Sequence, residues 1–209
     1  MFVELIDALR CPVPHKNAAD SCLVAAAAET VDRHIVRGTL GCPVCHAEYD
    51  IRHGDVWFGA EEPAAGFAVP SEDDVTRLAA LLAVDDRGGL YILDGAWGAM
   101  AAAVSGYSTA AHFILLSPPL GCEADGTLRG AGELVPIATG TARGIALDRH
   151  SAALAESAAR ALVANGRLIA PAATPVPPGI TVLARDEQHW VGEQNAPSSH
   201  PIPLRRAGR

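Results

Sequence analysis

The chain has 209 residues, a size typical of one ordinary domain with a small additional module. Its net charge of −8 argues against the basic surface by which proteins bind the phosphates of DNA or RNA. Its longest apolar runs are far shorter than a membrane span, and its first residues do not resemble a signal peptide. We therefore expect a cytoplasmic protein that binds no nucleic acid directly and no membrane.

Cysteine and histidine are concentrated at the start of the chain. Residues 1–60 hold four of the five cysteines and four of the eight histidines. An odd number of clustered cysteines favours a metal site in a reducing compartment over a disulfide framework. The same residues include few large apolar side chains, so a bound metal would supply stability that a small core lacks.

Short strands are predicted for this first module, residues 1–60. Its hydrophobic runs indicate four of them, at residues 22–28, 34–40, 49–52 and 55–58. Residues 29–33 would connect the first pair, and His53-Gly54 would form the turn of the second. Residues 61–71 are rich in proline, glycine and acidic side chains, which predicts a linker after the module.

From residue 72 onward, helical patterns alternate with buried strands. Ser71 and Asp74 have the spacing of a capping box and predict the start of one helix, and Ser151 is predicted to cap another that Asn165-Gly166 closes. Continuous apolar runs predict buried strands at residues 90–94, 112–116, 144–148 and 167–170, followed by a hairpin at 180–184 and 188–191. The alternation predicts a doubly wound sheet over residues 72–193, with a flexible tail at 194–209.

Two turns near the start of the chain could hold one metal ion. Cys42-Pro43-Val44-Cys45 places two thiols on a tight turn, which is half of a tetrahedral zinc site. Cys11-Pro12-Val13-Pro14-His15 resembles that turn, and we predict that Cys11 and His15 supply the other two ligands. The alternative ligands are Cys22, His34 and His46. Because cysteines at this spacing also arise by chance and buried cysteine is often inert, a metal-free module is the competing interpretation.

At these residues the chain resembles the zinc-ribbon family of methyltransferase activators. The family's opening helix and first Cys-Pro are matched by residues 5–12, and its closing motif by Cys42-Pro43-Val44-Cys45 and Tyr49-Asp50-Ile51-Arg52-His53-Gly54. The resemblance covers residues 1–60 and departs from the family at Pro14, where the second cysteine is expected. Either His15 replaces that ligand or the site is incomplete. The resemblance implies a zinc-binding module that pairs with a methyltransferase domain by adding a strand.

Residues 72–193 resemble class I S-adenosylmethionine methyltransferases. In that family the first strand ends in an acid and is followed by a glycine turn that lets the backbone approach the cofactor. Asp94, Gly95 and Gly98 match this pattern, and the resemblance implies that they would bind S-adenosylmethionine. Together the two resemblances predict an α/β protein in which a small zinc-ribbon-like β module precedes an abbreviated doubly wound Rossmann-like sheet.

Departures from the second family weaken the match to an active enzyme. Ala96 and Met100 replace two of the family's glycines, and the acid that would hold the ribose is absent from Leu116-Ser117-Pro118-Pro119. We therefore expect a non-catalytic or weakly catalytic zinc-binding scaffold that acts through a protein partner or self-association, and we assign no catalytic residue. The alternative is an active S-adenosylmethionine-dependent methyltransferase that uses Asp94 and the turn after it.

Overall fold

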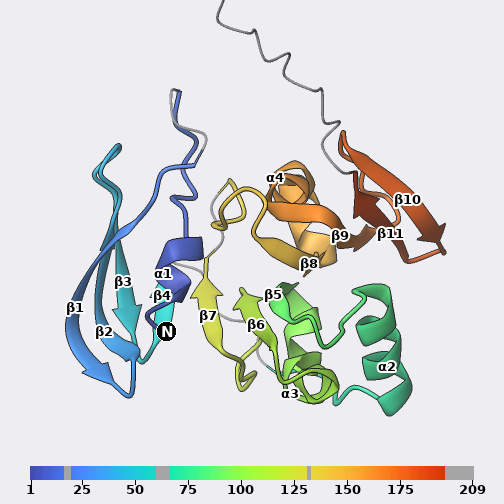
Figure 1. Ribbon diagram of the computed structural model, residues 1–209, viewed down its shortest axis with the longest axis horizontal. Coiled ribbons are helices and arrows are strands. Elements are labelled where there is room, and N and C mark those ends of the chain that lie inside the picture. The colour runs from blue at the N-terminus through green and yellow to red at the C-terminus, as the bar shows by residue number, and fades with distance from the viewer. Residues whose placement is uncertain (17–19, 60–65, 131–132, 196–209) are drawn as a thin grey trace, which may run out of the picture.

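The computed structural model describes residues 1–16, 20–59, 66–130 and 133–195, which form a mixed α/β fold (Figure 1). The strands in these residues are β1 (Val24–Val31), β2 (His34–Gly41), β3 (Glu48–Arg52), β4 (Asp55–Trp57), β5 (Gly89–Asp94), β6 (Ala111–Leu116), β7 (Gly126–Arg129), β8 (Ala142–Ala146), β9 (Leu162–Pro171), β10 (Ile180–Arg185) and β11 (His189–Gln194). The α-helices are α1 (Leu5–Ala8), α2 (Glu72–Leu81), α3 (Ala101–Val104) and α4 (Ala155–Ala161). Three 3₁₀ helices are η1 (Gly95–Met100), η2 (Ser105–Tyr107) and η3 (Arg149–Leu154). The predicted α/β class is confirmed.

All eleven strands belong to one sheet, in the order β1-β2-β3-β4-β7-β6-β5-β8-β9-β11-β10. The five strands from β7 to β9 in this order are parallel to one another. Antiparallel strands lie at both ends, with β1 to β4 on one side and the β10–β11 hairpin on the other. The sheet therefore runs without a break from residues 1–59, which we call the ribbon region, into residues 66–195, which we call the sheet region.

Helices cover both faces of the central strands. On β5, Tyr91 and Leu93 belong to a hydrophobic cluster that includes buried residues of α2 and α3, whereas Ile92 belongs to a second cluster with Leu5 of α1 and residues of α4. Because successive side chains of a strand point to opposite faces, the two clusters lie on opposite sides of the sheet. This burial on both faces explains why the central strands have continuous apolar sequences.

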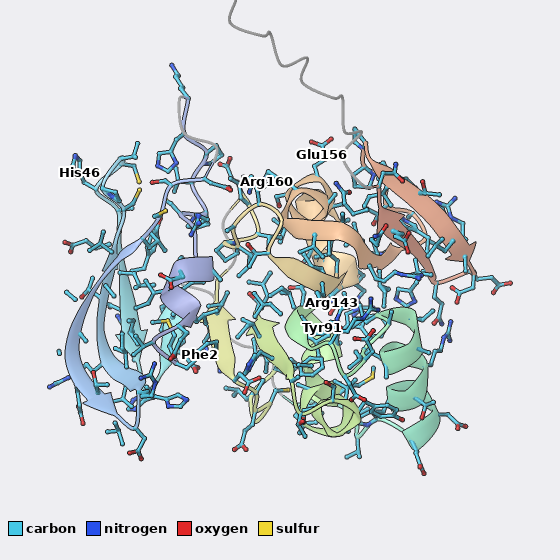
Figure 2. All side chains as sticks on the ribbon, viewed as in Figure 1. Phe2, His46, Tyr91, Arg143, Glu156 and Arg160 are labelled. Carbon is cyan, nitrogen blue, oxygen red and sulfur yellow. The ribbon has the colours of Figure 1, made fainter. Side chains whose placement is uncertain are left out.

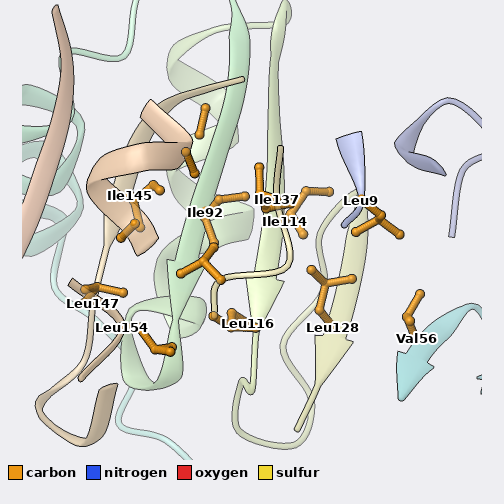
Figure 3. Packing of buried hydrophobic residues seen from close by; sticks show 14 of the residues in the cluster. Leu9, Val56, Ile92, Ile114, Leu116, Leu128, Ile137, Ile145, Leu147 and Leu154 are labelled. Atoms are coloured by element: carbon orange, nitrogen blue, oxygen red, sulfur yellow. The ribbon is translucent and has the colours of Figure 1, made fainter. Parts of the chain in front are cut away.

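The two regions are joined by strand pairing and by a shared core. Strand β4 of the ribbon region pairs in parallel with β7 of the sheet region. Across this junction, Nε of Arg129 donates a hydrogen bond to Oδ2 of Asp55 at 2.6 Å. One hydrophobic cluster continues from Leu9 and Val56 to Leu128 and on to the central strands, as Figure 3 shows. The small core of the ribbon region is therefore completed by side chains of the sheet region.

Several predicted elements are confirmed. The α2 capping box is present, because the Ser71 hydroxyl accepts from the Asp74 backbone N–H at 3.1 Å and the Asp74 carboxylate accepts from the Ser71 backbone N–H at 3.2 Å. The β3–β4 turn lies at His53-Gly54, and both residues have positive φ angles, of 53° and 85°. The predicted buried strands of the parallel sheet and the β10–β11 hairpin also occur within one or two residues of their predicted ends, except at the start of β9 and at the end of β11, which continues to Gln194.

Three boundaries differ from the prediction. Strand β1 continues to Val31, so the β1–β2 connection is the two-residue turn Asp32-Arg33 rather than residues 29–33. The helical segment after β8 is capped by Asp148 instead of Ser151, and α4 ends before β9 begins at Leu162. Asn165-Gly166 consequently lies inside β9, where the pairing with β8 is irregular, and does not end a helix. Strand β7 was not predicted, because Gly-Thr-Leu-Arg is too short to show a periodic pattern.

Parts of the predicted linker at residues 61–71 and of the tail at 194–209 lie outside the described residues, and their boundaries stay predictions. In the part of the chain that the structure describes, no helix combines the length and apolar character needed to cross a membrane.

Candidate metal centre and strand-end cavity

The four predicted metal ligands lie together in the ribbon region. The ligand atoms of Cys11, His15, Cys42 and Cys45 are all within 4.8 Å of one another, and we call this group the metal centre. Cys11 and Cys42 are buried, whereas Cys45 is exposed. The group lies at the end of the ribbon region where Figure 2 labels His46. Residues from two turns 27 or more positions apart are thus brought to one point.

The spacing of the ligand atoms fits a tetrahedral zinc ion. Zn–S bonds of about 2.3 Å and Zn–N bonds of about 2.0–2.1 Å at tetrahedral angles place two sulfurs about 3.75 Å apart, and a sulfur and a nitrogen about 3.5 Å apart. The observed separations are 3.8 Å between Cys11 Sγ and Cys45 Sγ, and 3.5 Å between Cys42 Sγ and His15 Nε2. The residues present therefore fit zinc in ligand type and in these two separations, and all the ligand atoms lie within 4.8 Å of one another.

Backbone hydrogen bonds hold the two turns that carry the ligands. In the connection between β2 and β3, the Cys42 backbone N–H donates to Ala47 O and the His46 N–H donates to Cys42 O, both at 2.9 Å. His46 has a φ of 60°, which closes this turn. After α1, the Cys11 N–H donates to Ser21 O at 2.9 Å and so places Cys11 beside the start of the β1 segment.

Surrounding groups affect the cysteine thiols in opposite ways. Burial raises the pKa of Cys11 to about 11. Burial also acts against ionisation of Cys42, but hydrogen bonds from the Cys45 backbone, the Ser21 hydroxyl and the Val44 backbone outweigh it and lower the pKa of Cys42 to about 6. The lowered pKa favours the thiolate of Cys42, which is the form that binds metals. The raised pKa favours the protonated thiol of Cys11, whose proton a bound metal would displace.

The alternative ligands are not part of the metal centre. The His34 side chain contacts the backbone O of Asp32 at 2.9 Å, and Cys22 and His46 are exposed outside the group. His15, and not one of these alternatives, lies with the three cysteines. Two hydroxyl contacts to the ligand sulfurs were missed by sequence reasoning: Tyr49 Oη lies 3.2 Å from Cys11 Sγ, and Ser21 Oγ lies 3.3 Å from Cys42 Sγ.

A second candidate site is a cavity of about 460 Å³ in the sheet region. It lies at the carboxyl ends of β5, β6, β7 and β8, and we call it the strand-end cavity. Its lining residues are Gly66, Phe67, Ala68, Asp94, Gly95, Ala96, Ala99, Ser117, Pro118, Pro119, Arg129, Gly130, Asp148, Arg149, His150 and Ser151. Of the three residues predicted to bind S-adenosylmethionine, Asp94 and Gly95 line the cavity, whereas Gly98 is buried against Pro118 and does not line it.

Two acidic side chains at this cavity accept hydrogen bonds from neighbouring backbone N–H groups. Asp94 is 1% exposed, and its Oδ2 accepts a hydrogen bond from the Asp148 N–H at 2.8 Å. Oδ2 of Asp148 in turn accepts from the Ala96 N–H at 2.8 Å. Gly95 has a φ of 55°, and a Cβ there would lie 2.3 Å from Asp148 Oδ2. The glycine is thus required by the close approach of the protein's own carboxylate.

Met100 and Phe67 lie at positions that the sequence did not indicate. Met100, which replaces one of the family's glycines in the second resemblance, lines a separate small pocket with Trp97 and Leu78. Phe67 comes from the segment before α2 and lines the cavity, although nothing in its sequence context indicated such a position. The shape of the cavity therefore depends on a segment assigned to the linker.

Comparison with known proteins adds no further guidance. No protein-family model matches the chain, and no curated protein matches it at a significant level. The function is therefore argued from the metal centre and the strand-end cavity themselves.

Proposed function

We propose that the protein is a zinc-binding scaffold with a methyltransferase-like sheet that is non-catalytic or weakly catalytic. The observation that carries this proposal is the convergence of three cysteines and one histidine at tetrahedral ligand separations. A zinc ion with four protein ligands has no open position for substrate, so its role is structural. When bound, the metal would connect the segment after α1 to the β2–β3 turn.

The metal centre is well placed to support the junction between the two regions. The segment that supplies Cys11 also contacts the sheet region, because the Arg10 N–H donates to Pro136 O at 3.0 Å and Ala8 O accepts from the Ala138 N–H at 2.8 Å. Beyond His15, Asp20 forms an ion pair with Arg160 at 2.7 Å. A metal that fixes this segment would therefore stabilise its contacts with the sheet region as well.

The strand order supports a methyltransferase-like sheet. The sequence β7-β6-β5-β8-β9 corresponds to strands 3-2-1-4-5 of a doubly wound nucleotide-binding fold, in which the ligand crevice lies at the carboxyl ends near β5 and β8. The pairing of β4 with β7 also supports the activator resemblance, since the ribbon region adds its strand to the sheet of its own chain. Two features favour a fold that is retained without catalysis. The Asp148 side chain occupies the space beside Gly95 in the glycine turn, and Ser117 stands where the family has the acid that binds the ribose.

Metal analysis of the purified protein tests the proposal. We expect about one zinc per chain after purification without added metal, because structural sites of this type bind tightly. Removal by a chelator should lower the temperature of thermal unfolding, and added zinc should restore it. Well under one equivalent of zinc, together with unchanged unfolding in chelator, would contradict the proposal.

A second candidate function is an active S-adenosylmethionine-dependent methyltransferase. The strand-end cavity favours it, because about 460 Å³ is within the usual range for small-molecule sites and Asp94 lies at its wall. Titration calorimetry with S-adenosylmethionine separates the two candidates. Micromolar affinity that is lost in Asp94→Asn would support the enzyme and remove the non-catalytic scaffold, whereas no heat of binding would support the scaffold.

As a scaffold, the protein would act in the cytoplasm through a protein partner or a second copy of itself. The edge strand β1 supports this, because its Val24 and Val31 side chains are 63% and 51% exposed. Exposed edges of this kind pair with further strands. Light scattering after size-exclusion chromatography measures self-association. A monomer at all concentrations would exclude pairing with a second copy and leave a different protein as the proposed partner.

A further inference from the structure

The buried sulfurs of the metal centre are contacted by two hydroxyl groups from outside the ligand turns. Tyr49 Oη lies 3.2 Å from Cys11 Sγ, and Ser21 Oγ lies 3.3 Å from Cys42 Sγ. Tyr49 belongs to β3, whereas Ser21 precedes β1, so the two groups come from different segments of the chain. All four residues are nearly inaccessible to solvent, with exposures of 6% or less. Water is therefore a poor source of hydrogen bonds for these two sulfurs.

Electrostatics gives these hydroxyls a role beyond packing. Three thiolates and one neutral imidazole leave one negative charge in excess around a divalent zinc ion. An uncompensated charge is costly in a buried environment, and hydrogen bonds to the charged group offset that cost. A zinc-bound thiolate has no proton to donate, so each hydroxyl must be the donor to its sulfur.

Resting on the proposed zinc site, we infer that Tyr49 and Ser21 are positioning residues that strengthen metal binding by donating hydrogen bonds to the Cys11 and Cys42 thiolates. Tyr49 is also held in place independently of the metal. Its ring packs edge-to-face on Phe58 with centroids 4.9 Å apart, and the Phe58 N–H donates to Arg129 O at 2.8 Å. The β4–β7 junction thus fixes the orientation of the Tyr49 hydroxyl toward Cys11.

Conservative variants of the full-length protein separate this role from packing. Tyr49→Phe retains the ring and its contact with Phe58, and Ser21→Ala removes only one oxygen. We expect each variant to bind zinc about 10–100-fold more weakly than the unmodified protein in competition with a chromophoric chelator, as is typical for lost outer hydrogen bonds. Matched controls are Tyr107→Phe and Ser105→Ala, whose hydroxyls bond to Thr76 and to Ala102 O away from the metal centre. They should bind zinc normally.

Cobalt substitution supplies a readout that a purely structural role would not change. In the fully loaded cobalt protein, losing a hydrogen bond raises the energy of the sulfur electrons, so the sulfur-to-cobalt charge-transfer band should shift to longer wavelength in both variants. Zinc affinities within twofold of the unmodified protein would overturn the inference, as would weaker binding with an unshifted band. If the unmodified protein bound no zinc, both the proposed function and this inference would fail. If the unmodified protein bound zinc normally and the two variants did so equally well, this inference alone would be rejected.

Discussion

The metal centre and the strand-end cavity lie in two regions of one sheet, and they differ in how their polar groups are used. In the metal centre, the ligand atoms of three cysteines and one histidine, side-chain types that bind zinc, lie within 4.8 Å of one another. At the cavity, the Asp148 carboxylate accepts from the Ala96 N–H beside Gly95, so the protein supplies its own anion to the glycine turn. The ribbon region thus has side chains close enough to bind a metal, whereas the acidic side chains at the cavity accept hydrogen bonds from the protein's own backbone.

The largest effect is expected from removing a metal ligand. Cys42→Ser should abolish zinc binding and lower the free energy of unfolding by more than about 4 kcal/mol, because loss of a structural metal is among the most destabilising changes. Zinc content and denaturant unfolding measure both results. Cys22→Ser and Cys122→Ser, which alter cysteines outside the metal centre, should retain zinc and stability. Equal zinc content in Cys42→Ser and the unmodified protein would contradict the proposal that the metal centre of the ribbon region binds zinc through Cys42.

A core substitution at the junction tests whether the two regions are stabilised together. Leu128 of β7 is fully buried between the regions, and Leu128→Ala should cost about 2–5 kcal/mol through lost burial and a residual cavity. Because the core is continuous, hydrogen exchange should increase in both β2 and β8. Leu183→Ala in β10, where the side chain is 47% exposed, should change stability by less than about 0.5 kcal/mol. Loss of protection in β8 alone would show that the regions unfold independently.

A smaller effect is expected at the glycine turn of the strand-end cavity. Gly95→Ala should destabilise the protein by about 1–3 kcal/mol, since it combines a positive φ with a clash against Asp148. In an Asp148→Ala background the contacts with the carboxyl group are removed, whereas the contact with the Cβ of residue 148, at 2.8 Å, remains. The same substitution should therefore cost at least about 0.5 kcal/mol less there. Denaturant unfolding of the four proteins measures this coupling. Strictly additive effects would show that the Asp148 carboxylate does not explain the glycine.

The smallest effect is expected at the start of α2, away from both sites. Ser71→Ala removes the hydroxyl that accepts from the Asp74 N–H and should cost about 0.5–2 kcal/mol. Ser71→Asp, which retains a capping oxygen, should recover most of the loss. Zinc content should be the same in both variants, since α2 does not contact the metal centre. A change in zinc content would mean that the metal centre responds to stability in general.

The sequence predicted those features that depend on local chemistry. The Ser71–Asp74 capping box, the His53-Gly54 turn and the buried run before Asp94 each have a short-range signal, and each was located correctly. The four side chains predicted to hold a metal also lie together, within 4.8 Å of one another, and the two Cys-Pro turns were the local signal for them.

Features that depend on long-range pairing could not be predicted in this way. Strand β7 carries only four residues and is defined by its neighbours β4 and β6, which lie far from it in the chain. The end of α4 was misplaced because Asn165-Gly166, an ordinary helix stop, occurs at an irregularity inside β9. The contacts of Asp148 with the turn after β5 likewise join residues about 50 positions apart. Tertiary packing determines all three.

X-ray absorption at the zinc edge of the purified protein tests the central claim most directly. With Cys11, His15, Cys42 and Cys45 as ligands, the spectrum should fit three sulfurs at about 2.3 Å and one nitrogen at about 2.0–2.1 Å. His15→Ala should remove the nitrogen contribution or the metal itself. A shell of four sulfurs, or a nitrogen that persists in His15→Ala, would contradict the assignment of His15 and with it the proposed zinc site.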